Sequence, residues 1–155
     1  MIKSNIDIIT RIVTFEILIE LQKLKPQKGL KNIHSFRKKV FWALDNLEPK
    51  FHFTCGNAKL PKETMIINLG CWFNCSGRKE GFCNICNECY DKQPEVRFKE
   101  RIKDRIEQEI IFRAFGKEFL TDHIIQTINN YNKTHKNKIK NIRWTEVGEL
   151  RNQSD

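Results

Sequence analysis

The sequence predicts an α+β or α/β fold, in which two N-terminal helices precede a small, mostly parallel sheet with flanking helices. Three observations carry this prediction. Apolar residues recur at helical spacing through the first 50 residues. Two short apolar runs with the length of strands follow them. From Thr64 onward the order is strand, loop, helices and strand, which is typical of a parallel, right-handed βαβ unit and of part of a barrel.

Two helices are expected at the N-terminus. Residues 5–24 carry a wide apolar stripe, and Pro26 breaks the pattern. Residues 32–47 place apolar side chains on one side of a second helix, which Pro49 ends. We therefore assign residues 1–50 to a helical N-terminal extension.

Residues 51–155 are predicted to form a second domain around a βαβ unit. The runs 51–55 and 64–69 are rich in strand-forming residues, and a turn containing Gly56 and Pro61 separates them. The run 64–69 is almost continuously apolar, which indicates a strand buried on both faces.

Helical patterns return after the second strand. Apolar residues recur every four positions in the first of them, at Phe98, Ile102, Ile106 and Ile110, and Gly116 interrupts the pattern. A further helix is expected around residues 119–128. The polar run 129–138 is predicted to be a loop, and residues 139–147 a last strand.

The chain is basic and carries no membrane-spanning pattern. Its 155 residues have a formal net charge of +9 and a pI near 9.3, a balance that favours nucleic acid, nucleotides or anionic lipid as partners. Lysines spread along the chain also fit an ordinary solvated surface. The apolar stretch 6–24 contains charged residues that include Asp7, Arg11, Glu16 and Glu20, and no secretory signal is visible, so we expect a cytoplasmic protein without a membrane anchor.

Five of the six cysteines lie in one short segment. They are Cys71, Cys75, Cys83, Cys86 and Cys89, with the spacing C-x3-C-x7-C-x2-C-x2-C. In a reducing compartment, clustered cysteines are more often metal ligands or catalytic thiols than disulfides. Groups of three or four thiolates select zinc or iron–sulfur chemistry. The segment therefore predicts a metal centre.

The spacing leaves the kind of centre open. Cys83, Cys86 and Cys89 resemble the run that wraps a [4Fe–4S] cluster in small ferredoxins, with Cys71 or Cys75 available to close the site. A zinc site would use Cys71, Cys75, Cys83 and Cys86. Disulfides and simple burial remain the non-metal alternatives. Cys55 stands apart and is expected to pack behind a strand.

Four stretches in a fixed order resemble a known family. "GNAKLPKETMIINL", the cysteine loop ending in "CY", "PEVRFKERI" and "IRWTEVGEL" are together similar to the "gene product eighty-eight" domain family of phages and mobile elements. The resemblance covers about residues 55–150. It favours a mobile-element protein, for which a zinc-stabilised, nucleic-acid-binding role is the alternative to an iron–sulfur protein.

A weaker resemblance is to the N-terminal part of radical S-adenosylmethionine enzymes. In that family a cysteine motif follows the first strand and binds a [4Fe–4S] cluster, and a turn after the second strand approaches the cofactor. The resemblance implies that Gly148 and Glu149 contact S-adenosylmethionine. Because the chain is shorter than a complete barrel, it also implies a truncated and inactive relative.

A few other side chains are candidates for the site. Arg143 and Glu146 could hold an anionic ligand or a cofactor amine, or could be exposed charges on a strand. His52, near Cys55, is a candidate metal ligand, although a surface or core position is favoured. Trp72 and Trp144 are expected in the core rather than over a cluster or a base.

Overall fold

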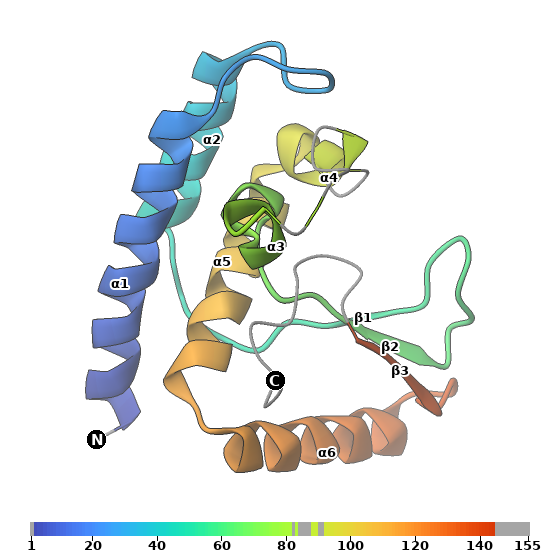
Figure 1. The fold of residues 1–155 in the computed structure, drawn as a ribbon. Coiled ribbons are helices and arrows are strands. Elements are labelled where there is room, and N and C mark those ends of the chain that lie inside the picture. The colour runs from blue at the N-terminus through green and yellow to red at the C-terminus, as the bar shows by residue number, and fades with distance from the viewer. Residues whose placement is uncertain (1, 82, 84–87, 90–91, 145–155) are drawn as a thin grey trace.

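The computed structural model describes residues 2–81, 83, 88–89 and 92–144. It has the predicted α+β architecture, with helices around a small sheet (Figure 1). In chain order the elements are α1 (Ile2–Lys23), α2 (Ile33–Asp45), β1 (Thr54–Cys55), β2 (Thr64–Ile67), the 3-10 helix η1 (Trp72–Asn74), α3 (Ser76–Lys79), α4 (Lys92–Arg97), α5 (Lys99–Ala114), α6 (Lys117–Thr134) and β3 (Asn141–Trp144).

The main core lies between α1, α2 and α5. Figure 1 shows α1 and α2 side by side next to α5, and their buried apolar residues form one cluster. The side chain of Asn32 accepts a hydrogen bond from the Ser35 N–H at 2.8 Å, which caps the start of α2. The cluster also takes in Cys71, Trp72 and Phe73, so the start of the cysteine loop is part of this core.

The sheet is mixed and has the order β1-β2-β3. β2 and β3 are parallel, with Thr64 opposite Asn141 and Ile67 opposite Trp144, which confirms the parallel pairing expected of a βαβ unit. β1 pairs antiparallel with β2, so the expectation of a mostly parallel sheet holds for one of the two pairings. β1 is also shorter than the predicted 51–55, because pairing with β2 begins only at Thr54.

A second, smaller core joins the sheet to α6. Met65, Ile67, Ile124 and Ile139 are buried there, with Ile128 and Tyr131 packed against them. The prediction of a loop over residues 129–138 is wrong in its first half, since α6 continues to Thr134. In this last part of α6, Asn129 and Asn130 are exposed and Asn132 is partly exposed. The ring of Tyr131 meets the ring of Phe53 edge-on, with centroids 6.0 Å apart, and this contact holds the last turn in a helical conformation.

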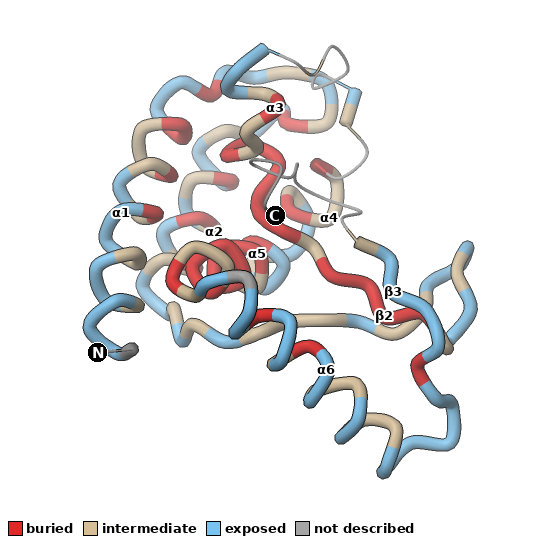
Figure 2. The backbone as a smooth tube through the Cα atoms, turned by 60° about the horizontal axis from the view of Figure 1, so that its bottom comes forward, coloured by how far each residue is buried: buried red, intermediate tan, exposed pale blue. Residues whose placement is uncertain are grey.

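Helix α5 connects the two cores. Figure 2 shows it buried over most of its length, whereas α6 is largely exposed. The helical pattern predicted from Phe98 corresponds to α5, with the exposed Phe98 as its N-cap residue, and the short helix α4 precedes it. Among the described residues, we find no helix with both the length and the hydropathy that crossing a membrane requires.

Candidate metal loop and the adjacent pocket

The first half of the cysteine loop is built into the main core. It leaves the carboxyl end of β2, and Cys71, Trp72, Phe73 and Asn74 are all buried. Phe73 meets Phe36 of α2 edge-on, with ring centroids 5.6 Å apart. This packing confirms the expectation that Trp72 is a core residue.

Cys71 has the surroundings of a neutral, structural thiol. It is fully buried, and its Sγ lies 3.7 Å from the carbonyl oxygen of Ile102, to which the thiol donates. Burial raises the pKa of Cys71 well above its ordinary value, and the nearby carboxylate of Glu95 raises it further. In the metal-free protein this thiol is therefore held in its neutral form, and the role of Cys71 as a metal ligand stays a prediction.

Buried carboxylates from α4 and α5 hold this half of the loop. Glu95 accepts the Trp72 N–H at 3.0 Å and forms an ion pair with Arg105. The side-chain amide of Asn74 donates to both oxygens of Glu109, at 3.1 and 3.2 Å. Because buried polar groups are expensive without partners, these contacts fix the backbone around Trp72 and Asn74.

The second half of the loop is more exposed. Cys75, Cys83 and Cys89 are partly exposed, and no disulfide joins any two of the described cysteines. The backbone of this half is tied down at two points, since the Cys83 N–H donates to the Gly77 carbonyl at 3.0 Å and the Lys92 N–H donates to the Cys89 carbonyl at 3.3 Å. Cys86 lies outside the described residues.

A buried lysine lies beside the last described cysteine. Lys92 is only 2% exposed, and its Nζ lies 5.4 Å from the centroid of the Trp72 ring, on which it makes a cation–π contact. Burial lowers the pKa of Lys92, whereas a negative charge on Cys89 opposes that effect. A thiolate at Cys89 and the ammonium of Lys92 would therefore stabilise each other.

The described cysteines do not form a closed site by themselves. No three cysteine sulfur atoms among the described residues lie within 4.8 Å of one another. Cys75, Cys83 and Cys89 are partly exposed, whereas Cys71 is fully buried. The shared metal centre of Cys83, Cys86 and Cys89 stays a prediction. Gly148 and Glu149 lie outside the described residues, as does Glu146.

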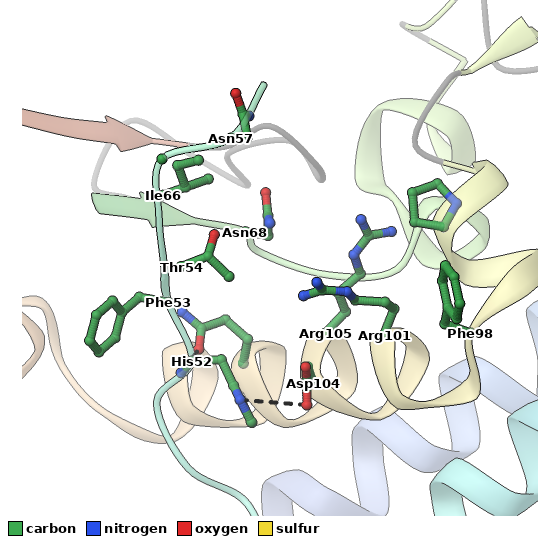
Figure 3. Close-up of a pocket in the computed structure, with 13 residues that line it drawn as sticks. His52, Phe53, Thr54, Asn57, Ile66, Asn68, Phe98, Arg101, Asp104 and Arg105 are labelled. Carbon is green, nitrogen blue, oxygen red and sulfur yellow. Dashed lines mark hydrogen bonds and ion pairs between the residues drawn. The ribbon is translucent and has the colours of Figure 1, made fainter. Parts of the chain in front are cut away.

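A pocket opens next to this loop, between α5 and the segment that runs from His52 to Asn57. Its volume is about 480 Å³, and Asn68 lies at its edge directly after β2. Figure 3 shows Arg101 and Arg105 extending from α5 toward Asn68. Ligand sites in α/β units form outside the carboxyl ends of strands, and this pocket has that position relative to β2.

His52 lies between two carboxylates of α5 at one side of the pocket. Its Nε2 is 2.6 Å from Oε2 of Glu107, and its Nδ1 is 3.6 Å from Oδ1 of Asp104 (Figure 3). Burial raises the pKa of the fully buried Glu107, but hydrogen bonds from His52, the Glu48 N–H and Lys103 outweigh burial and lower it. Glu107 is therefore a buried carboxylate held in its charged form.

This trio is the group of three side chains in the described part of the chain that comes close enough to hold a metal ion. The other oxygen of Glu107 is already occupied, because it accepts the Glu48 N–H at 2.6 Å and lies 2.9 Å from Nζ of Lys103. An ammonium at that distance opposes a cation. We interpret the trio as an arrangement that orients His52 through its hydrogen bond with Glu107, with Asp104 at ion-pair distance from the other ring nitrogen.

The sequence did not lead us to predict this trio of His52, Asp104 and Glu107. His52 was a candidate ligand because of its place near Cys55, but the structure directs its ring to α5 instead. Asp104 and Glu107 are three residues apart on a helix and therefore share a face, which was the available signal. Arg143 is an exposed residue of β3, and Trp144 packs against Phe112 at 5.6 Å.

The chain is thus an α+β protein with a loop of partly exposed cysteines beside a pocket lined by arginines. Comparisons of the chain with protein-family models, with curated proteins and with solved structures found no match.

Proposed function

We propose that this protein binds a metal centre, an iron–sulfur cluster, through the thiolates of Cys83, Cys86 and Cys89. The observation that carries the proposal is the buried Lys92 beside Cys89. A negative charge at Cys89 opposes the effect of burial on the Lys92 ammonium, so the two charges stabilise each other. A thiolate-ligated cluster supplies such a charge, and hydrogen bonds and charges near its sulfur atoms tune it.

The resemblance to radical enzymes extends this proposal to a second ligand. Three closely spaced thiolates leave one iron of a [4Fe–4S] cluster open, and S-adenosylmethionine is the ligand that such an iron takes in that family. Gly148 and Glu149 would then contact it.

Anaerobic reconstitution with iron and sulfide tests the proposal. A brown protein with broad absorbance near roughly 400 nm is expected for a [4Fe–4S] cluster. Bound iron and sulfide should both be stoichiometric with the chain. A colourless protein that carries stoichiometric zinc after the same treatment would contradict the iron–sulfur assignment and support the zinc alternative.

A second function, nucleic-acid binding, is favoured by one surface. The loop between β1 and β2 and the segment between α6 and β3 lie side by side, because the Lys140 N–H donates to the Glu63 carbonyl at 2.8 Å. Five exposed lysines lie on these two segments, namely Lys59, Lys62, Lys136, Lys138 and Lys140, and the exposed Lys133 lies in the adjoining last turn of α6. Residues 129–144 contain no aspartate or glutamate. Such a surface fits contacts to phosphates.

Salt dependence tests this second function. Affinity for single-stranded DNA should fall steeply between low and moderate salt. In a plot of log affinity against log salt concentration, each phosphate contact should contribute about −0.7 to the slope. The double variant Lys62→Gln/Lys140→Gln should reduce the slope. The charge-matched control Lys31→Gln/Lys38→Gln changes two exposed lysines around the start of α2 and should leave it unchanged. Equal effects of the two pairs would show that only overall charge matters.

A further inference from the structure

We propose that the pocket between α5 and the His52–Asn57 segment binds a small organic ligand through an oxyanion group, a phosphate or a carboxylate. The site is separate from the cysteine loop, and its chemistry does not depend on a metal. Three features of the pocket support this assignment: a buried amide without a partner, an arginine available for a ligand, and an apolar wall.

The buried amide belongs to Gln108. Its side chain is 1% exposed and lines the pocket, and its Oε1 accepts the His52 N–H at 2.7 Å. This bond fixes which way the amide faces. Its Nε2 is buried and has no hydrogen-bond partner in the described part of the chain. Because a buried donor without an acceptor is unfavourable by about 1–3 kcal/mol, an acceptor from a ligand would remove that penalty.

Two arginines supply the positive charge. Arg105 is 7% exposed and its ion pair with Glu95 fixes its position, so it offers a rigid guanidinium at the pocket wall. Arg101, one turn earlier on α5, is exposed, and its guanidinium forms no hydrogen bond or ion pair with any of the described residues. A guanidinium binds carboxylate or phosphate with two parallel hydrogen bonds, which makes Arg101 the main anchor.

Asp104, the one carboxylate among the described residues of the pocket lining, does not oppose an anion strongly. Asp104 faces His52, whose Nδ1 lies 3.6 Å from its Oδ1, as the dashed line in Figure 3 shows. The two arginines extend from the same helix toward Asn68 at the other side of the pocket. The anion is therefore expected on the arginine side, close to the end of β2.

The size and walls of the pocket indicate more than a bare ion. A volume of about 480 Å³ lies within the range of small-molecule sites. Phe53, Ile66, Pro94 and Phe98 contribute apolar surface, and Phe98 is 56% exposed at the beginning of α5. An organic group next to the oxyanion would cover this surface.

Isothermal titration of the full chain with three probes tests the inference: inorganic phosphate, adenosine 5′-monophosphate and succinate. We expect one site and a dissociation constant below about 1 mM for at least one probe. Binding of both phosphate compounds identifies a phosphate site, and binding of succinate alone identifies a carboxylate site. Failure of all three to bind below about 1 mM would overturn the proposal.

Two variants locate the site. Arg101→Gln changes an exposed residue and should weaken the best probe at least about tenfold, whereas the matched control Arg11→Gln, on α1, should not. Gln108→Glu keeps the acceptor for the His52 N–H but replaces the amide donor by a carboxylate oxygen, and should abolish binding. Unchanged affinity in Arg101→Gln, or equal losses in Arg101→Gln and Arg11→Gln, would refute the assignment even if Gln108→Glu did not fold.

Discussion

The two halves of the cysteine loop have opposite surroundings. Cys71 is fully buried in the helical core and its pKa is raised, whereas Cys83 and Cys89 are partly exposed and Cys89 lies beside the ammonium of Lys92. The first half packs on Phe36, and buried carboxylates fix its backbone. The second half is held by backbone hydrogen bonds and by an exposed ion pair of Lys28 with Glu88 at 3.0 Å.

Cysteines that are clustered in a sequence therefore need not share a role. Cys71 precedes Trp72 and Phe73, two large apolar residues that enter the core and take the thiol with them. Cys89 follows the exposed Glu88. The spacing of the cysteines alone does not show which of them enters the core.

The largest effect on stability is expected from Trp72→Ala. Trp72 is 3% exposed, so its removal leaves a cavity in the main core and should lower the free energy of unfolding by about 3–5 kcal/mol. Chemical denaturation followed by circular dichroism measures this change. The control Phe41→Ala, at a 48% exposed aromatic of α2, should change it by no more than about 1 kcal/mol. Similar values for both would contradict the burial of the first half.

Glu95→Gln should come next. The variant leaves Arg105, which is 7% exposed, without its counter-charge, and breaking a buried ion pair in this way costs about 3 kcal/mol or somewhat more. Glu100→Gln, an exposed position at the start of α5, is the matched control and should be nearly neutral. A loss in Glu95→Gln no larger than in the control would show that Glu95 does not anchor the loop.

Cys71→Ser should have a moderate effect. The hydroxyl is more polar than the thiol and must be buried against a single carbonyl oxygen, that of Ile102, so the metal-free protein should lose about 1–3 kcal/mol. Cys83→Ser changes a partly exposed residue and should have a smaller effect on the same metal-free protein. The reverse order would mean that the second half carries the structural thiol.

The smallest effect concerns Lys92 and pH in the metal-free protein. Because burial lowers the pKa of Lys92 from 10.5, the unfolded chain binds its proton more tightly than the folded chain does. Lys92→Met removes this titration, so the stability of the wild type relative to Lys92→Met should increase as pH rises from the lowered pKa toward 10.5. Denaturation of both proteins at neutral and alkaline pH measures the difference, and a relative stability of the wild type that falls with pH would contradict the lowered pKa.

Much of the fold could be predicted from hydrophobic spacing. The patterns at residues 5–24 and 32–47 correspond to α1 and α2, and the apolar run at 64–69 contains β2. The polar composition of residues 129–138 gave a wrong prediction for the last turn of α6. That turn is helical because Tyr131 packs against the sheet. The antiparallel pairing of β1 could not be predicted, since a two-residue strand carries almost no pattern of its own.

The candidate site was predictable only in part. Thiol spacing indicated a metal loop, but the neutral state of Cys71 depends on burial against α5, which no local pattern shows. The contact of His52 with Glu107 joins residues 55 positions apart. The Gln108 amide could be recognised as part of the pocket only from the hydrogen bond that it accepts from the His52 N–H. Such long-range pairs require the fold.

The metal content of two serine variants tests directly whether Cys89 binds the metal centre while Cys71 is a structural thiol. Cys89→Ser and Cys71→Ser are reconstituted anaerobically with iron and sulfide in parallel with the wild type, and bound iron is measured per folded chain. We expect Cys89→Ser to lose most of its metal, because a hydroxyl cannot replace a thiolate ligand, whereas Cys71→Ser should retain its metal. Full metal content in Cys89→Ser together with its loss in Cys71→Ser would contradict the division of the loop.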